Sequence, residues 1–165
     1  MKIFKKIEVE IKNLFENFLN DLDEHLLPYT NSNETIIFYL NMKAFIYRSM
    51  TEFPTIFDSK EAIEKSLMTY REAHRIACVN LSPIDSMRLN ISLNFSVFYY
   101  EILNFVDEAC RLSKKAFDDA IKELHNLHCR EEETNKDTYL LMHLLRDNLT
   151  LWSSDLHGKF LKFLH

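Results

Sequence analysis

The sequence predicts an all-α protein built as an array of antiparallel helices. The chain has 165 residues but only one glycine and three prolines. β-sandwiches and barrels need turn residues about every 8–12 positions, and α/β folds need glycines where strands meet helices. Apolar residues instead recur at spacings of three and four, as they do along one face of a helix. They make up 47% of the chain, which is enough for a sizeable core.

Six helices are expected, with short breaks that make neighbours antiparallel. Pro28 and Pro54 end the first two, because the residue before a proline is disfavoured in helical geometry. A core stripe of Phe38, Met42, Phe45 and Ser49 is expected in the second helix, with Ile37, Leu40 and Ala44 beside it. The expected ranges are about 4–27, 34–52, 60–79, 83–104, 106–128 and 136–154.

Turn and capping residues mark the starts of four of these helices. Ser82 followed by Pro83 predicts an N-cap and a proline in the first helical position. The other expected caps are side chains that can accept a hydrogen bond from a free backbone N–H. They are Ser32 with its neighbours Asn31 and Asn33, Asp58 or Ser59, and Thr134 or Asn135.

Charge and cysteine content exclude several classes of protein. The net charge of −5 argues against non-specific nucleic-acid binding, which needs a basic surface. No apolar run approaches the roughly 18 residues of a membrane span, and the charged N-terminus does not resemble a signal peptide. The three cysteines, Cys78, Cys110 and Cys129, are widely spaced and favour a reducing compartment. We therefore expect a cytoplasmic protein with neither nucleic-acid nor membrane partners.

No catalytic motif or cofactor signature is present in the sequence. There is no glycine-rich phosphate loop and no nucleophile elbow, so an enzyme is not expected and no cofactor is implied. His125, His128 and Cys129 have a spacing that could offer metal ligands, but a fourth ligand of matching spacing is missing. Histidines at the end of a helix also suit its negative C-terminal dipole, so no metal site is expected.

Polar residues interrupt the apolar stripes of two expected helices. In the sixth helix, Asn148 lies in the middle of a stripe formed by Leu141, Leu144, Leu145, Leu151 and Trp152. In the fourth, Asn94 and Glu101 lie among Leu93, Val97 and Phe98. An asparagine can donate and accept together, so a pair of them can hold a peptide backbone between leucines. Alternatively, the two asparagines bond each other, a backbone group or water.

Three stretches of the sequence resemble signature segments of the 14-3-3 family. They are Leu93 to Leu103, Leu144 to Trp152, and Phe38 to Ala44 followed by Tyr47 and Arg48. The resemblance runs from Lys6 to Asp155. It implies an all-α adaptor that binds phosphoserine or phosphothreonine peptides, regulates client proteins, dimerises and has no catalytic activity.

The resemblance also implies a binding site, residue by residue. Asn94 and Asn148 match the clamp on the peptide backbone, and Arg48 matches an arginine that contacts the phosphate. Glu101 and Trp152 match contacts near the peptide. The apolar groove wall falls on Leu93, Val97, Leu144 and Leu151.

Several family positions are changed in this chain. The family places two more basic phosphate contacts on a helix that precedes Met1, a tyrosine of the pocket is Ser49 here, and a groove lysine is Asn41, although Lys43 remains. A hydrogen bond to a charged group contributes about 1.5–3 kcal/mol. Phosphopeptide affinity is therefore expected to be weakened.

The chain resembles the C-terminal two-thirds of the family fold, without its N-terminal helices. We expect a helical domain over residues 1–155 and a C-terminal tail over 156–165. The family's dimer helices are among those lacking, so the chain alone should dimerise poorly or associate non-specifically. Unlike the family's acidic tail, this one is basic and aromatic. It is either a disordered or locally packed end, or it folds back onto apolar surface through Phe160, Leu161, Phe163 and Leu164.

Two other functions fit the same pattern. A divergent relative would bind unphosphorylated or acidic peptides. Comparing the affinity for a phosphopeptide with that for the same peptide without phosphate distinguishes this function from phosphopeptide binding. A helical structural or assembly subunit would bind its partner without using Asn148.

Overall fold

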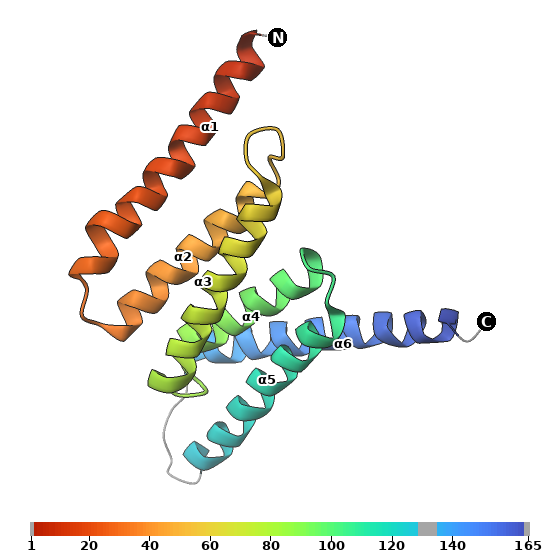
Figure 1. Cartoon of the computed structure of the whole chain (residues 1–165). Coiled ribbons are helices and arrows are strands. Elements are labelled where there is room, and N and C mark those ends of the chain that lie inside the picture. The colour runs from red at the N-terminus through yellow and green to blue at the C-terminus, as the bar shows by residue number, and fades with distance from the viewer. Residues whose placement is uncertain (1, 129–134, 164–165) are drawn as a thin grey trace. The chain divides into compact units, whose positions relative to one another are not determined.

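Six α-helices run through the part of the chain that the structure describes, which contains no strand (Figure 1). The computed structural model covers the backbone of residues 2–128 and 135–163 and the side chains of 3–127 and 135–157. The helices are α1 (Lys2–Asn20), α2 (Asn33–Met50), α3 (Ser59–Asn80), α4 (Ser86–Glu101), α5 (Val106–His128) and α6 (Lys136–Phe163). The predicted all-α class is confirmed.

The helices group into two compact units, Met1–Ile76 and Ala77–His165. Helix α3 runs from the first into the second. Each unit has its own buried core and is described by itself. The expected division into a domain over 1–155 and a tail over 156–165 stays a prediction.

The first unit is held together by a core between α1, α2 and α3. A π-helical turn (Asp21–Leu26) and a short 3-10 helix (Leu27–Tyr29) follow α1, and the chain leaves helical geometry after Pro28 as expected. The Ser66 hydroxyl donates a 2.9 Å hydrogen bond to the Ala44 carbonyl and so joins α3 to α2. The buried core residues are Leu22, Ile46, Tyr47, Met50 and Ala62.

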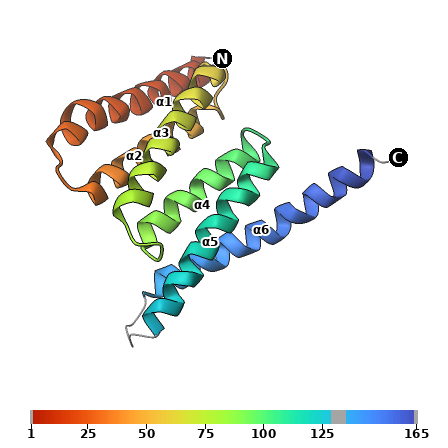
Figure 2. The ribbon, with the colours of Figure 1, turned by 60° about the horizontal axis from the view of Figure 1, so that its bottom comes forward.

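The second unit is a bundle of α4, α5 and α6, in which each helix contacts the other two. Helices α4 and α5 lie side by side (Figure 2). Small buried residues on α5, Ala109 and Ala120, allow the neighbouring helices to approach closely. One apolar cluster contains Leu89, Leu124, Met142 and Leu145, and another contains Val106 and Trp152.

Arg88 fastens the beginning of α4 to its surroundings. Its Nη1 donates to the carbonyl of Cys78 (3.2 Å), in the last turn of α3, and to that of Leu81 (2.9 Å), just after the helix. Carbonyls at the end of a helix lack partners within the helix, so Arg88 acts as a cap from outside. Its Nη2 also lies 3.5 Å from Asp119 Oδ2 of α5.

The start of α4 differs from the prediction. Ser82 and Pro83 do not open the helix; they form a turn in which the Asp85 N–H donates to the Ser82 carbonyl at 2.9 Å. Asp85 is the cap, and its carboxylate accepts hydrogen bonds from the N–H groups of Met87 (2.8 Å) and Arg88 (3.3 Å). A carboxylate also interacts favourably with the positive end of the helix dipole. The predicted caps Ser32, Asp58 and Asn135 are confirmed.

The predicted end of α6 and the predicted core face of α2 were also wrong. Helix α6 continues past Ser154 to Phe163, because Leu156 still packs on the cluster of Trp152 and a single glycine, Gly158, costs a helix only about 1 kcal/mol. In α2, Phe38 and Phe45 are exposed, whereas Ile37 and Ala44, which were expected beside the stripe, are fully buried. The buried residues of α2 are Ile37, Ala44, Ile46, Tyr47 and Met50.

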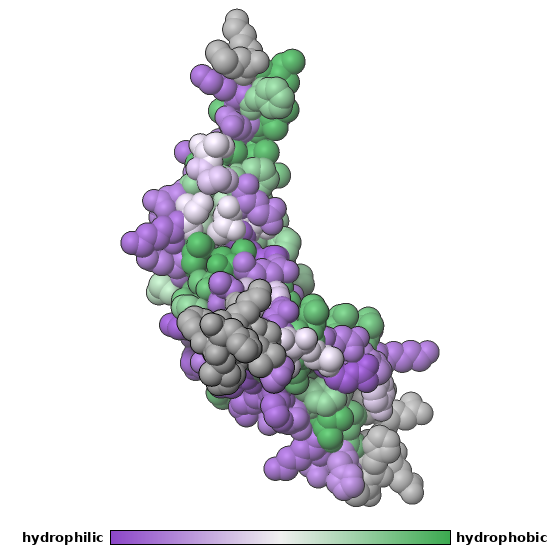
Figure 3. Space-filling model, turned by 90° about the vertical axis from the view of Figure 1, so that its right-hand side faces the viewer, coloured by the Kyte–Doolittle hydropathy of each residue, from purple (hydrophilic) through white to green (hydrophobic). Residues whose placement is uncertain are grey.

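Helix α1 leaves part of its apolar stripe uncovered. Phe15 and Leu19 pack on the core of the first unit, but Ile7 and Leu14 are exposed. Hydrophobic side chains are visible at the top of Figure 3, where the N-terminal end of α1 lies. Among the described residues, no helix combines the length and apolar content that crossing a bilayer requires.

The cap of α4 gives a first testable prediction. Asp85→Ala removes the acceptor for two backbone N–H groups and should lower the free energy of unfolding by about 1 kcal/mol. Urea unfolding followed by circular dichroism measures this change. Lys122→Ala, at an exposed position of α5, is the control and should stay within about 0.5 kcal/mol of the wild type. Equal stability of the two variants would show that the cap is dispensable.

Candidate functional site

On α6 the predicted site residues divide between two faces. Leu144, Asn148 and Leu151 follow one another at helical spacing; Leu144 is 42% and Leu151 59% exposed, while Asn148 is half-buried. Leu145 and Trp152, each one position further along, belong to the buried face. The face that remains accessible therefore carries one carboxamide between two leucines.

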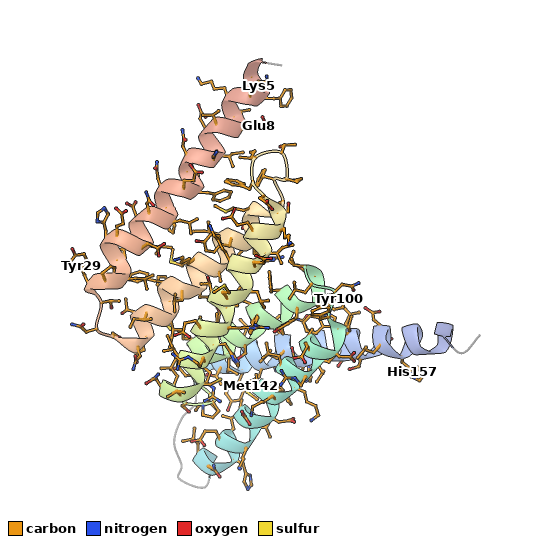
Figure 4. All side chains as sticks on the ribbon, in the orientation of Figure 1. Lys5, Glu8, Tyr29, Tyr100, Met142 and His157 are labelled. Carbon is orange, nitrogen blue, oxygen red and sulfur yellow. The ribbon has the colours of Figure 1, made fainter. Side chains whose placement is uncertain are left out.

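Trp152 lies beneath this face, with only 3% of its surface exposed. Its ring stacks on Tyr100 of α4, with 4.8 Å between ring centroids and 18° between planes. Tyr100, labelled in Figure 4, donates a hydrogen bond from its hydroxyl to Asp155 Oδ2, and this bond raises the pKa of Tyr100. These contacts join the C-terminal part of α4 to α6, so Trp152 fixes the position of the helix that carries Asn148.

On α4 the predicted residues lie on the face opposite the buried one. Asn94, Val97 and Glu101 share this face with Asn90, which precedes Asn94 by one turn. Asn94 is half-buried, and its Nδ2 donates a 3.1 Å hydrogen bond to Asn90 Oδ1. Glu101, the last residue of the helix, is exposed. Both predicted carboxamides are therefore outside the solid core.

Direct packing of α4 on α6 brings the eight predicted peptide contacts into one unit. Leu93 packs against the cluster that contains Leu145 and Met142, and Met142 is labelled on α6 in Figure 4. Val97 packs against the cluster that contains Trp152. The half-buried side chains of Leu93 and Val97 thus lie beside the α4–α6 contact. A peptide seated here would meet leucine and valine side chains next to carboxamides.

Arg48, the predicted phosphate contact, belongs to the first unit. It lies near the C-terminal end of α2, is half-buried, and its positive charge acts on the hydroxyl of Tyr70. Burial raises the pKa of Tyr70 to about 12, while the Arg48 guanidinium opposes this rise.

Two polar side chains of α2, Ser49 and Lys43, make contacts within the first unit. The Ser49 hydroxyl donates a 2.9 Å hydrogen bond to the Phe45 carbonyl, one turn earlier in α2. Its single proton is therefore used within the helix. Lys43 pairs with Asp23, and its ammonium lies 6.0 Å from the centre of the Tyr47 ring. Both side chains are therefore engaged by neighbouring residues of the first unit.

Three residues that support the site were not found from the sequence. Asn90 holds the Asn94 carboxamide, and its position four residues earlier is a signal that could have revealed it. Tyr100 and Asp155 are separated by 55 positions, so no local pattern connects them. These supports orient the predicted contacts.

A metal centre is absent from the part of the chain that the structure describes. No three histidine, cysteine, aspartate or glutamate side chains there come close enough together to hold an ion. His125 is exposed on α5. The His128 side chain and Cys129 lie outside the described residues.

The helical arrangement is that of an all-α protein, and comparison with known proteins identifies its family. The model of the 14-3-3 protein family matches residues 1–153. The 14-3-3 protein epsilon of Drosophila melanogaster is 49% identical over 154 residues, covering 93% of this chain and 58% of the relative. The 14-3-3-like protein GF14 nu of Arabidopsis thaliana is 50% identical over 154 residues, covering 93% and 57%.

The chain therefore belongs to the 14-3-3 family, as its signature segments predicted. A rice relative, the 14-3-3-like protein GF14-C of Oryza sativa subsp. japonica, shows the same pattern, with 50% identity over 151 residues. In each of these comparisons the chain spans less than three-fifths of the relative's length, at 57% or 58%.

The environment of Tyr70 predicts a pH dependence of stability. Its folded pKa of about 12 lies above the value near 10 of an unfolded tyrosine. The contribution of Tyr70 to the free energy of unfolding is fully present below pH about 10. It is lost as the pH rises towards 12, because in this range the unfolded state releases the phenol proton and the folded state keeps it. The loss should reach about 1 kcal/mol by pH 11.

Urea unfolding between pH 9 and pH 11 measures this effect. Tyr70→Phe should lose less stability over the interval than the wild type, since no phenol remains to ionise. Tyr29→Phe, at an 80% exposed position, serves as the control and should follow the wild type. A Tyr70→Phe variant as pH-sensitive as the wild type would contradict the assignment.

Proposed function

We propose that the protein is an adaptor that binds phosphoserine or phosphothreonine peptides and regulates client proteins in signalling. The observation that supports this most is the pair of accessible carboxamides, Asn94 and Asn148, on two helices that pack together. Membership of the 14-3-3 family supports it independently. We propose the cytoplasm as its location, as the cysteine pattern predicts, and no catalytic role.

In this proposal the asparagines bind the main chain of an extended peptide. Each carboxamide offers an acceptor and two donor hydrogens, which match the N–H and C=O groups of a peptide backbone. The hydrogen bond from Asn94 to Asn90 fixes the orientation of one carboxamide before the peptide arrives. Preorganised contacts improve affinity because less freedom is lost on binding.

Apolar side chains around the carboxamides would seat the peptide's own side chains. Leu144 and Leu151 are exposed on either side of Asn148, and Leu93 and Val97 are half-buried on α4. Glu101 would contact the peptide, and Trp152 would act from beneath by holding α6. Covering exposed leucines stabilises a complex by about 25 cal/mol for each Å² removed from water.

Arg48 would bind the phosphate in this proposal. A phosphate monoester carries nearly two negative charges at neutral pH, and a guanidinium can bind it through two parallel hydrogen bonds. With Ser49 bonded to Phe45, most of the phosphate recognition within this chain depends on Arg48. Phosphorylation should therefore strengthen binding only moderately.

The carboxamide clamp can be tested by Asn148→Ala. This change removes the hydrogen bonds to the peptide backbone and should weaken binding of a phosphoserine peptide about 10- to 100-fold. Isothermal titration calorimetry measures the affinity. Asn126→Ala, at an exposed position of α5, is the matched control. Unchanged affinity in Asn148→Ala would favour a structural or assembly role instead.

The phosphate contact can be tested by Arg48→Gln. The wild type should prefer a phosphoserine peptide to its unphosphorylated twin by about tenfold or more, since charge-assisted hydrogen bonds contribute about 1.5–3 kcal/mol. In Arg48→Gln the preference should disappear, while Arg71→Gln, an exposed residue of α3, should keep it. Equal binding of both peptides by the wild type would show that phosphate recognition is not a property of this chain.

A further inference from the structure

Two phenylalanines of α2 are exposed, although this helix supplies much of the core of the first unit. Phe38 is 48% and Phe45 is 53% exposed, whereas Ile37, Ala44 and Tyr47 beside them are buried. A single exposed ring is common on protein surfaces, but residues seven positions apart lie on the same face of a helix. None of the proposed peptide or phosphate contacts uses either ring.

The same face of α2 carries the predicted phosphate contact. Phe38, Asn41, Phe45 and Arg48 follow one another at spacings of three, four and three, and we call them the α2 row. Asn41 and Arg48 are half-buried, so the row is accessible along its whole length. Residues three apart on a helix have Cβ atoms about 5–6 Å apart. Phe45 is therefore an accessible apolar neighbour of Arg48.

The main chain of Phe45 is engaged while its side chain is exposed. The Phe45 carbonyl accepts the 2.9 Å hydrogen bond from the Ser49 hydroxyl. This bond lies within the helix and does not involve the ring. A change of the Phe45 side chain therefore leaves the hydrogen bond in place.

An extended peptide whose phosphate is bound by Arg48 can reach Phe45. In an extended chain, side chains two positions apart point to the same side and lie about 6.6 Å apart. This distance is close to the separation of neighbouring residues in the α2 row. The residue next to the phosphoserine points to the opposite side. The ring would therefore meet the residue two positions from the phosphoserine.

The charge of Arg48 determines which kind of side chain suits this position. An aromatic ring can be covered by an apolar side chain or by a cation. A lysine or arginine over the Phe45 ring would lie beside the like charge of Arg48, which is unfavourable. An apolar side chain has no such cost and removes the ring from water.

We infer that Phe45 selects peptides that carry a large apolar residue two positions from the phosphoserine. This inference rests on the proposed phosphate contact of Arg48. Because Phe45 lies on one side of Arg48 along α2, the preference concerns one side of the phosphoserine only.

A set of fluorescein-labelled phosphoserine peptides tests this preference. The peptides carry phenylalanine, lysine or alanine two positions before or two positions after the phosphoserine, and fluorescence anisotropy measures their affinities. On one side only, phenylalanine should strengthen binding about fivefold over alanine, since covering apolar surface is favourable in proportion to its area. Lysine should give no gain. A gain from lysine equal to that from phenylalanine, or no gain from phenylalanine on either side, would overturn the inference.

Phe45→Ser shows whether the preference comes from this ring. The variant should bind the phenylalanine and alanine peptides equally but should still prefer phosphoserine to serine. Met68→Ser, at a 70% exposed position of α3 in the same unit, is the matched control and should keep both preferences. Circular dichroism verifies that both variants are folded.

The two preferences also separate this inference from the proposed function. A preference for phosphoserine without a preference for phenylalanine would overturn only the role of Phe45. A phenylalanine preference that persists in Phe45→Ser would do the same. Equal binding of phosphorylated and unphosphorylated peptides by the wild type would overturn both proposals.

Discussion

The burial of α4 is the constraint on which the second unit depends. Leu89, Ile91, Phe95 and Phe98 of this helix are almost fully buried, and Leu89 packs with residues of α5 and α6. The serines on the same side must find partners inside the protein, and Ser92 and Ser96 donate to the carbonyls of Arg88 and Leu93. Unsatisfied hydroxyls here would cost about 1–3 kcal/mol each. Only the opposite face can offer polar groups to a ligand, and that face carries Asn90, Asn94 and Glu101.

Much of the fold could be predicted because local signals dominate in a helical protein. Helix α5 begins and ends where its apolar pattern predicts, and Ser32 and Asp58 are recognisable caps. Predictions failed where two signals competed. Asp85, and not Ser82, caps α4, because its carboxylate accepts hydrogen bonds from two backbone N–H groups. In α2, spacing could not decide between two apolar stripes, since the choice depends on where α1 and α3 pack.

The candidate site residues could be predicted from the sequence, but the extent to which each is buried could not be predicted. The stripe on α6 appeared continuous, yet Trp152 lies inside and Leu151 outside. This difference depends on the angle at which α6 meets α4, which is a tertiary property. The contact between Tyr100 and Asp155 joins residues 55 positions apart and leaves no local pattern. The role of Ser49 was equally hidden, because an isolated sequence does not show that its hydroxyl bonds to Phe45.

The position of Trp152 also allows the second unit to be followed separately by fluorescence. It is the single tryptophan of the chain, and it belongs to the unit Ala77–His165. Its indole emission therefore reports on that unit alone, through its buried stack on Tyr100. The other unit contributes only tyrosine absorbance and helical ellipticity. Where the emission and the ellipticity change at different denaturant concentrations, the halves of the molecule melt as separate cooperative blocks.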